Sequence, residues 1–447
     1  MFIKVMIKEN SLIIVSVLVV LIGIFYTYNY KYKIYNHDHE ITYNYFPRGF
    51  YLGTSDESYA LINQYSTDNE ASNKVSEIEA LSSLKAAIDL KKQGRLDRAL
   101  KLFEHAAALA PKHPDVLTKY GEFLEKTKKD IVKADQLYFQ ALTYCPTHTD
   151  AVSNRQRTAT IVADIDNSRL KSIDRKRDAL AAIPESNGSL RRAKKEAYFS
   201  YIYHAVAIEG NTMTLQQTRS VLETRMAVMG KSIDEHNEIL GLDSAMKYIN
   251  SSILNRMGEI TTGDILEIHR RVLGHVDPVE GGSMRRTQVY VGGHVPPSPS
   301  DLTVLMSRFE RWLNTQRESE TIHPVRLAAL AHYKLVHIHP FTDGNGRTSR
   351  LLMNVILMQA GYPPVIILKQ HRHLYYETLR IANEGDVRPF VRFIAECTEN
   401  TLDLFLWATS EFSNKVPALA QEFSTTTHSS DLLEGSADFY DDLNGVS

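Results

Sequence analysis

The sequence predicts a mainly α-helical chain of several domains, preceded by a membrane-spanning helix. Three observations support this fold class. Apolar residues recur at helical spacing in the second half, a repeat of small and aromatic residues spans two helical hairpins, and a long helical pattern joins the two parts. With 447 residues, 43% hydrophobic content and a formal net charge of −2, the chain has material for two or three cores and no basic excess for nucleic-acid binding.

The first part of the chain is expected to be a membrane anchor. Residues 1–10 form a short N-terminal segment, residues 12–25 are almost wholly apolar, and residues 11–29 are long enough to cross a bilayer as one helix. Tyr26, Tyr28 and Tyr30 would lie in the interfacial region, where tyrosine is enriched. Because no small-residue cleavage site follows the apolar run, we expect a retained signal anchor rather than a cleaved signal peptide.

The side of the membrane on which the body lies is only weakly marked in the sequence. Basic residues flank the apolar segment in nearly equal numbers, so the positive-inside rule does not decide the orientation. Asn187 and Asn250 begin Asn-x-Ser sequons, which are candidate glycosylation sites and favour a lumenal body. Cys145 and Cys397 are the only cysteines, and both fall in helical patterns, so we expect no disulfide framework.

Residues 30–79 are polar and are expected to form a stalk, and residues 80–148 contain two copies of a repeat. Its small, aromatic, small and proline order recurs at a spacing of 35 residues, as Ala99, Phe103, Ala106 and Pro111, then Ala134, Tyr138, Ala141 and Pro146. This order resembles tetratricopeptide repeats, which are about 34 residues long and stack as helical hairpins. Residues 149–189 continue as a long helical pattern that would cover the end of the stack.

The most informative segment is residues 339–350, His-Pro-Phe-Thr-Asp-Gly-Asn-Gly-Arg-Thr-Ser-Arg. Apolar residues at helical spacing predict one helix over 324–338 and another over 347–360, so the segment is expected to join two helices. Gly361 and Pro363 would end the second helix. A titratable base, a metal-binding carboxylate, a glycine-rich turn and two arginines therefore fall in one loop, as an enzyme that transfers a phosphate-linked group requires.

The glycine-rich turn predicts an anion site. Gly344, Asn345 and Gly346 are able to direct successive backbone N–H groups inward at the start of a helix, where phosphate binds readily. Arg347 and Arg350 lie three residues apart, share one face of the first turn and suit phosphate oxygens. A Gly-Asn-Gly turn alone is more often a plain connection between helices, but such a connection has no use for two arginines and an acid on one side.

Two further side chains of the loop have chemical roles available. Asp343 is its only carboxylate, and one carboxylate together with phosphates and waters is a common way to hold Mg²⁺. His339 lies at the loop entrance, where an imidazole is able to take a proton from an attacking hydroxyl. Histidine pairs elsewhere lack an acid or a cysteine at ligand spacing, so no structural transition-metal site is expected.

The segment matches H-P-F-x-[D/E]-G-N-G-R-x-x-R at every defined position and therefore resembles the signature of the Fic family, whose members transfer AMP. The resemblance implies that His339 deprotonates a Ser, Thr or Tyr hydroxyl of a target protein, and that Asp343 holds Mg²⁺ or Mn²⁺. The hydroxyl would then attack the α-phosphorus of ATP, and pyrophosphate would leave. Asn345, Gly346 and Arg347 are implied to bind the phosphates, and the residues of the loop implied to bind the nucleotide as a whole are Asp343, Gly344, Asn345, Gly346, Arg347, Thr348, Ser349 and Arg350.

Residues 203–211 resemble the inhibitory helix of Fic proteins, [S/T]-x-x-x-E-[G/N]. The resemblance implies that Glu209 lies against Arg350 and draws it away from the γ-phosphate, so that ATP binds poorly or in an unreactive pose. One position departs from the pattern: Ala205 stands where the family has Ser or Thr, so a hydroxyl that helps to fix this helix is missing. The alternative is that Glu209 merely ends a helix before Gly210.

Residues 287–297 alternate polar and apolar positions and then turn at two glycines, which predicts a short β-hairpin. The hairpin resembles the Fic flap, which would pair with an extended stretch of the target by backbone hydrogen bonds. The flap residues implied to touch the nucleotide are Gly292, Gly293, His294 and Val295. Downstream, Tyr375, Tyr376 and Asn383 match family positions that pack on the adenine and ribose.

The all-α Fic core is expected over residues 190–412, followed by a disordered tail over 413–447. The order of anchor, repeats, inhibitory helix and core resembles the membrane-anchored animal members of the family. That resemblance implies a single-pass type II protein of the endoplasmic-reticulum membrane, with a lumenal catalytic part that acts in the unfolded protein response. It also implies a homodimer, the chaperone BiP as a target recognised by the repeats and the flap, and hydrolytic removal of AMP with Glu209 orienting a water.

Two alternatives remain open from the sequence. A Fic transferase that uses another donor, such as a different nucleotide or phosphocholine, would carry the same loop. A repeat-bearing membrane scaffold with a relic nucleotide site would not be an enzyme, and the intact His339, Asp343 and both arginines argue against it.

Overall fold

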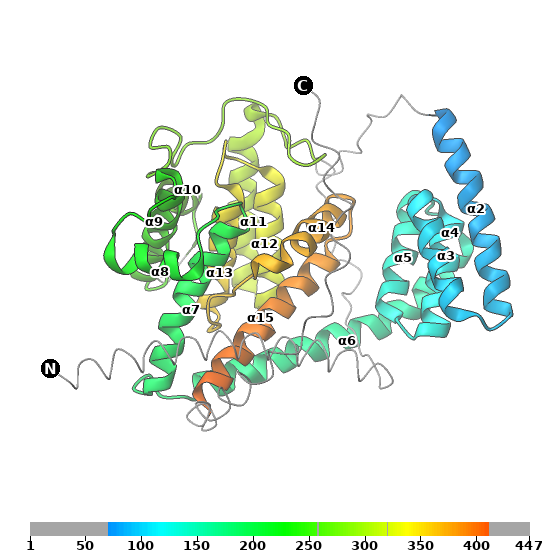
Figure 1. Ribbon diagram of the computed structural model, residues 1–447, viewed down its shortest axis with the longest axis horizontal. Helices are drawn as coiled ribbons and strands as arrows, with labels where there is room; N and C mark the ends of the chain where they lie inside the picture. The colour runs from blue at the N-terminus through cyan, green and yellow to red at the C-terminus, as the bar shows by residue number, and fades with distance from the viewer. Residues whose placement is uncertain (1–69, 257–258, 320, 411–447) are drawn as a thin grey trace. The chain divides into compact units, whose positions relative to one another are not determined.

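The computed structural model describes residues 70–256, 259–319 and 321–410, and within these ranges the fold is mainly α-helical, as predicted (Figure 1). Its helices run from α2 to α15, and the same ranges contain no strand. The predicted membrane anchor, most of the stalk and the tail lie outside the described residues. Among the described helices, none combines the length and the apolar composition needed to cross a membrane.

The predicted repeat region forms paired helices. It comprises α2 (Glu70–Lys92), α3 (Leu96–Leu109), α4 (Pro114–Phe123), the π-helix η2 (Leu124–Lys128) and α5 (Ile131–Tyr144). α2 packs on α3, and α4 packs on α5. The repeat positions Phe103 and Tyr138 are both buried in its core, and Gly121 lets the Tyr138 ring approach, since a Cβ there would lie 2.6 Å from it. That these hairpins are tetratricopeptide repeats stays a prediction.

α6 (Thr149–Ala181) is a single helix of 33 residues that follows the repeat region (Figure 1). It ends before the predicted linker boundary at residue 189. Pro184 follows closely and cannot continue the helix, and Asn187 starts the next one, α7 (Gly188–Ala207). The Asn187 side chain accepts hydrogen bonds from two backbone N–H groups of α7, at 2.8 and 3.0 Å, so the sequon asparagine is also a helix cap.

The remaining helices form the core of the second part. After α7 they are α8 (Leu215–Thr224), α9 (Ile233–Tyr248), the π-helix η3 (Ile249–Ile253), α10 (Thr262–Leu273), α11 (Leu302–Ser319), α12 (Pro324–Ile338), α13 (Asn345–Gln359), α14 (Arg372–Asn383) and α15 (Arg388–Thr409). The short 3-10 helices η4 (Pro299–Asp301) and η5 (Lys369–His371) precede α11 and α14. Thr214, Ser232 and Thr261 begin α8, α9 and α10 with reciprocal capping boxes, which fix where these helices start.

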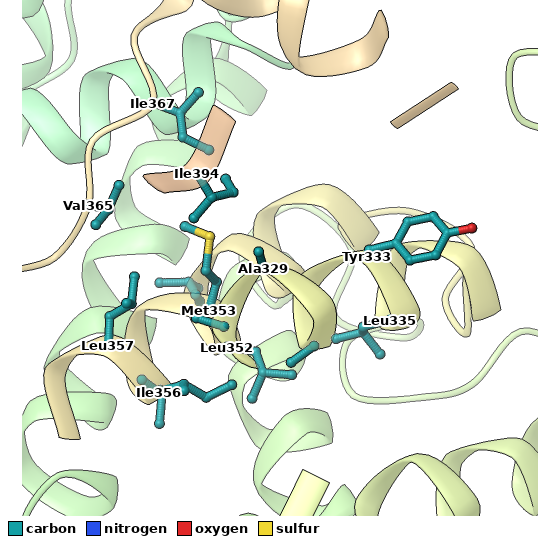
Figure 2. Packing of buried hydrophobic residues seen from close by; sticks show 14 of the residues in the cluster. Ala329, Tyr333, Leu335, Leu352, Met353, Ile356, Leu357, Val365, Ile367 and Ile394 are labelled. Atoms are coloured by element: carbon teal, nitrogen blue, oxygen red, sulfur yellow. The ribbon is translucent and has the colours of Figure 1, made fainter. Parts of the chain in front are cut away.

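α12 and α13 pack against each other in this core and carry the predicted loop between them. Figure 2 shows Leu352 and Met353 of α13 close to Ala329 of α12, and all three side chains are buried. Burying each of the larger apolar side chains contributes about 1.5–3 kcal/mol. Because both helices are held by this packing, the loop that joins them is fixed at its two ends.

The segment predicted as a β-hairpin contains one antiparallel bridge, in which Val291 and His294 exchange backbone hydrogen bonds of 3.0 and 2.8 Å. Gly292 and Gly293 form the turn between them, with φ of +51° and +84°. No strand extends from this bridge within the described ranges, and the two prolines that follow lack the N–H groups that a longer ladder would need. The hairpin is therefore unconfirmed beyond its turn.

Candidate active site

The loop between α12 and α13 has a backbone that its sequence explains. α12 ends at Ile338, the next residue, His339, adopts the left-handed conformation with φ of 51°, and Gly344 has φ of +75° immediately before α13. The Asn345 side chain accepts from the N–H of Phe341 at 3.0 Å and donates to its carbonyl at 2.8 Å. This double hydrogen bond closes the loop on itself, so Asn345 supports the shape of the anion-binding turn.

His269 of α10 contacts the loop and helps to hold its backbone in place. Its Nε2 donates to the carbonyl of Asp343 at 3.0 Å, its Nδ1 accepts from the N–H of Gly282 at 3.0 Å, and its ring stacks on Phe341 at 3.6 Å. The ring is buried, and burial lowers the pKa of His269 to about 4, so the imidazole is neutral as both hydrogen bonds require. His269 was not among the predicted site residues, since nothing in the local pattern of α10 marks it.

Arg285 joins the start of the flap to the loop. Its side chain donates to the carbonyls of His339, Thr287 and Pro297 at 2.7, 3.0 and 2.5 Å, and its backbone N–H donates to the carbonyl of Pro340 at 2.8 Å. The side chain is buried, and burial lowers the pKa of Arg285. Arg285 was also missed, because its partners are backbone carbonyls that leave no trace in the sequence.

His339 has the arrangement of a general base. Its Nδ1 lies 3.1 Å from the carbonyl of Val336, which only accepts, so Nδ1 carries the proton and Nε2 is the proton acceptor. The side chain is half-buried rather than enclosed. Burial lowers the pKa of His339 from its ordinary value of 6.5, and the nearby Arg285 charge adds to this effect. The imidazole is therefore neutral at neutral pH.

Arg347 is buried at the first turn of α13 and binds two carboxylates. Its Nη2 donates to Asp343 at 2.7 Å, and its Nη1 donates to Glu238 of α9 at 3.2 Å. The Asp343 side chain is 65% exposed, which fits a carboxylate that shares a divalent ion with bound phosphates and waters. No group of three potential metal-ligating side chains occurs within the described part of the chain, so a dedicated all-protein metal site is absent there.

Arg350 lies one turn further along α13 and is 2% exposed. Its Nη2 donates to Glu209 Oε1 at 2.5 Å and to the carbonyl of Ala205 at 2.9 Å, and its Nη1 donates to the Tyr375 hydroxyl at 3.3 Å. Burial alone would raise the pKa of Glu209, but attraction to Arg350 outweighs it and lowers that pKa. The two side chains therefore form a charged, largely enclosed pair.

The Glu209 carboxylate also covers the start of α13. A Cβ placed on Gly346 would lie 2.5 Å from Glu209 Oε1 and 3.1 Å from Arg350 Nη1. Tyr376 donates to the second carboxylate oxygen at 3.2 Å. Glu209 thus occupies the space above the helix N-terminus that favours an anion, and a side chain at position 346 would collide with its carboxylate.

The other predicted nucleotide residues are distributed around this loop. His294 Nε2 donates to the carbonyl of His337 at 3.0 Å, and His337 Nδ1 donates to Asn383 Oδ1 at 3.1 Å, so the flap turn and the end of α14 meet at the end of α12. Tyr376 is partly exposed, whereas Tyr375 is buried behind Arg350. Thr348 and Ser349 are fully buried in α13, and neither hydroxyl has a partner among the described residues. The nucleotide contacts of all these residues stay predictions.

Comparisons with known proteins agree with the loop and the core. The family model described as Fic/DOC family matches residues 259–357. The chain is 62% identical over 396 residues to "Protein adenylyltransferase Fic" of Culex quinquefasciatus, covering 86% of this chain and 79% of the relative. It is 68% identical over 343 residues to the protein of the same name in Drosophila melanogaster, covering 77% and 69%.

Among solved structures, a fragment of Fic-1 from C. elegans is similar, with a TM-score of 0.68 and 46% identity over 74% of this chain and 98% of that chain. A Fic domain containing signaling protein from Bacteroides thetaiotaomicron matches with a TM-score of 0.50 and 25% identity, over 54% of this chain and 96% of that chain. The similarity therefore covers the loop, the core and much of the region before it.

Proposed function

The chain belongs to the Fic/DOC family, and from this premise we propose that it is a protein adenylyltransferase that moves AMP from ATP onto a Ser, Thr or Tyr hydroxyl of another protein. The curated relatives are named for that activity. The observation that carries the proposal is the His339 imidazole, which is half-buried and bonded through Nδ1 to the Val336 carbonyl at 3.1 Å. Its Nε2 is the proton acceptor beside a glycine-rich turn with two arginines.

In the proposed reaction, His339 Nε2 accepts the proton of the target hydroxyl as the hydroxyl oxygen attacks the α-phosphorus of ATP. A new oxygen–phosphorus bond forms, the bond from the α-phosphorus to the bridging oxygen breaks, and pyrophosphate leaves with both electrons of that bond. Reactions of this type depend mainly on the positions of the reactants and on stabilisation of charge. The chain therefore needs a fixed base and a fixed anion site more than an unusual nucleophile.

The phosphates are proposed to bind over the first turn of α13, where the backbone N–H groups of residues 345–347 and the side chains of Arg347 and Arg350 favour anions. Asp343 would hold Mg²⁺ or Mn²⁺, and the ion neutralises phosphate charge when it is bound. The adenosine is proposed to be held by two elements. One is α14, with the side chains of Tyr375, Tyr376 and Asn383, and the other is the flap turn, residues 292–295.

We further propose that Glu209 inhibits transfer. Its contact with Arg350 and its place above Gly346 support this role, because an ATP phosphate would need the same guanidinium and the same helix terminus. A hydrogen bond to a charged group is worth about 1.5–3 kcal/mol, so displacing this carboxylate weakens ATP binding. The same carboxylate is proposed to orient a water in the reverse reaction, the hydrolytic removal of AMP.

The target and the cellular setting are proposals that rest on the resemblance to membrane-anchored animal members of the family. We propose the endoplasmic-reticulum chaperone BiP as the protein substrate, with the repeats and the flap as its recognition surfaces. We also propose a single-pass type II membrane protein with a lumenal catalytic part, a homodimeric state and a role in the unfolded protein response. Exposed Asn250 supports glycosylation of that lumenal part.

We expect the 447-residue chain, incubated with labelled ATP, Mg²⁺ and BiP, to attach one AMP to a hydroxyl of BiP. The Glu209→Gly form serves as the more active sample. Mass spectrometry of the modified peptide gives both the added group and its position. An adduct with the mass of a different nucleotide or of phosphocholine would show that the donor is not ATP. ATP binding without any adduct in the Glu209→Gly form would favour the non-enzymatic scaffold.

The space beside Ala205 gives a prediction about the strength of inhibition. A small cavity there is lined by Tyr201, Ala205 and Arg350, and Arg350 Nε has no partner among the described residues. We expect Ala205→Ser to place a hydroxyl in this cavity and stabilise the inhibitory helix. One net hydrogen bond of about 1 kcal/mol corresponds to about a fivefold fall in basal transfer, measured as the initial rate of AMP incorporation.

Ala205→Cys is the matched control, because it fills the same space with a weak hydrogen-bonding group. We expect it to lower the basal rate less than serine does. A higher basal rate in Ala205→Ser than in the unchanged chain would contradict the proposed role of this cavity.

A further inference from the structure

The carboxylate of Glu238 contacts two parts of the site that are far apart in the sequence. One oxygen accepts from Arg347 Nη1 at 3.2 Å, and the other accepts from Asn211 Nδ2 at 2.8 Å. Arg347 belongs to the phosphate-binding loop, whereas Asn211 follows the inhibitory Glu209 by two residues. Glu238 therefore joins the segment that carries Glu209 to the guanidinium beside the anion site.

Asn211 is well placed to hold that segment. Its side chain is largely buried, its Nδ2 also donates to the carbonyl of Glu235 at 3.0 Å, and its Oδ1 accepts from the N–H of Met213 at 3.0 Å. The chain after Glu209 is therefore anchored to α9 through Asn211. Because Glu238 lies on the same helix, a change in its carboxylate acts on this anchor and on Arg347 together.

Burying the charged carboxylate of Glu238 costs free energy, and its hydrogen bonds with Arg347 and Asn211 offset this cost. Burial raises the pKa of Glu238, and repulsion from Asp343 and Glu209 adds to this, while Asn211 and Arg347 oppose it. A buried carboxylate is tolerated where both oxygens accept hydrogen bonds. A glutamine of the same shape has one oxygen and one NH₂ group, so it is able to accept from Arg347 or from Asn211 but not from both.

The two carboxylates on Arg347 differ in exposure. The Asp343 side chain is 65% exposed, and the Glu238 side chain is 22% exposed. Asp343 is the residue suited to share a metal ion with the phosphates, so it is not a permanent partner of Arg347. Glu238 is the enclosed partner, and it is able to hold the guanidinium in one orientation whether or not a nucleotide is bound.

We propose that Glu238 is a positioning residue for AMP transfer, and that its carboxylate couples the segment carrying Glu209 to the phosphate-binding arginine Arg347. This inference rests on the proposed function and deepens it. Glu238 acts in two ways: it strengthens the inhibitory contact by anchoring Asn211, and it supports transfer by orienting Arg347. The first effect lowers the rate of AMP transfer and the second raises it. When Glu209 is removed, only the second effect remains.

The test compares Glu238→Gln in the unchanged full-length chain and in the Glu209→Gly chain. In the unchanged chain we expect basal transfer to rise about three- to tenfold, because the contact between Asn211 and residue 238 is weakened and Glu209 leaves Arg350 more often. In the Glu209→Gly chain we expect kcat to fall about tenfold with a small change in the KM for ATP, because only the orientation of Arg347 is then affected.

Asp234→Asn is the matched control, since Asp234 is an exposed acid on the same helix and its change removes the same charge. We expect its effect to be much smaller than that of Glu238→Gln in both backgrounds. Thermal melting of each variant establishes that the chains are folded at the assay temperature.

A fall in transfer of similar size in both backgrounds would show a merely structural role and overturn the proposal, as would no change in either. The failure of the proposed function looks different, because the Glu209→Gly chain itself would then transfer no AMP. The reversal of sign between the two backgrounds is the result that supports Glu238 as the coupling residue.

Discussion

His339→Ala is expected to abolish AMP transfer, with a fall in kcat of about 10²- to 10⁴-fold, the usual contribution of a general base. The Val336 carbonyl holds Nδ1 in its protonated form at 3.1 Å, so Nε2 is the atom that accepts the hydroxyl proton. The only carboxylate of the loop is Asp343, which is proposed to hold the metal ion and is therefore not available as the base. The initial rate of AMP incorporation, measured in the Glu209→Gly chain, gives the effect.

ATP affinity is the control for this substitution. The imidazole is not placed to hold the phosphates, so we expect the dissociation constant of ATP to change little in His339→Ala. Transfer that continues at an undiminished rate would exclude His339 as the base.

The pH dependence of kcat provides a second measurement. A base is active when it is unprotonated, so transfer is lost as the pH falls through the pKa of His339. Burial lowers that pKa from 6.5, and therefore the loss is expected below pH 6.5 rather than above it. This acid limb should disappear from the residual activity of His339→Ala.

Local patterns were sufficient to predict the helices that hold the loop. The helix predicted over 324–338 is α12 with the same bounds, and the second helix, predicted over 347–360, is α13 (Asn345–Gln359). Apolar spacing and the Gly361–Pro363 stop carry this information within one segment. The mainly α-helical part of the predicted fold class is confirmed for the described ranges, and the membership of the Fic family follows from the loop motif and the comparisons.

The residues that support the loop from elsewhere were not predictable in the same way. Arg285, His269 and Glu238 contact residues 54, 74 and 109 positions away, and their partners are backbone carbonyls or a single guanidinium. Such contacts arise only after α9, α10 and the flap pack against the loop. The hairpin was predicted from the alternation of polar and apolar residues alone. Pro296 and Pro297 lack N–H groups and limit backbone pairing to the bridge at the glycine turn.

Glu209→Gly is expected to raise AMP transfer about 10- to 100-fold, the range that corresponds to losing one or two charge-assisted hydrogen bonds. In the unchanged chain Arg350 is 2% exposed and is neutralised by Glu209 at 2.5 Å. Removing the carboxylate frees the guanidinium and the space above Gly346 for a phosphate. The KM for ATP and the initial rate of AMP incorporation measure this effect, and Glu209→Gln, which keeps the shape without the charge, should give an intermediate rate.

The same substitution, which is expected to raise the transfer rate, should lower the thermal stability of the chain when ATP is absent. Without Glu209, Arg350 is a buried cation whose remaining hydrogen-bond partners among the described residues are the Ala205 carbonyl and the Tyr375 hydroxyl, and breaking a buried ion pair costs about 3–5 kcal/mol. We therefore expect Glu209→Gly to melt at a lower temperature than the unchanged chain. ATP should raise the melting temperature of the variant by more than it raises that of the unchanged chain, because a phosphate replaces the missing anion. If the variant bound ATP no more tightly and transferred AMP no faster, the contact between Glu209 and Arg350 would be structural, and the proposal of autoinhibition would fail. The same variant is also expected to lose the hydrolytic removal of AMP, since the carboxylate proposed to orient the water is gone.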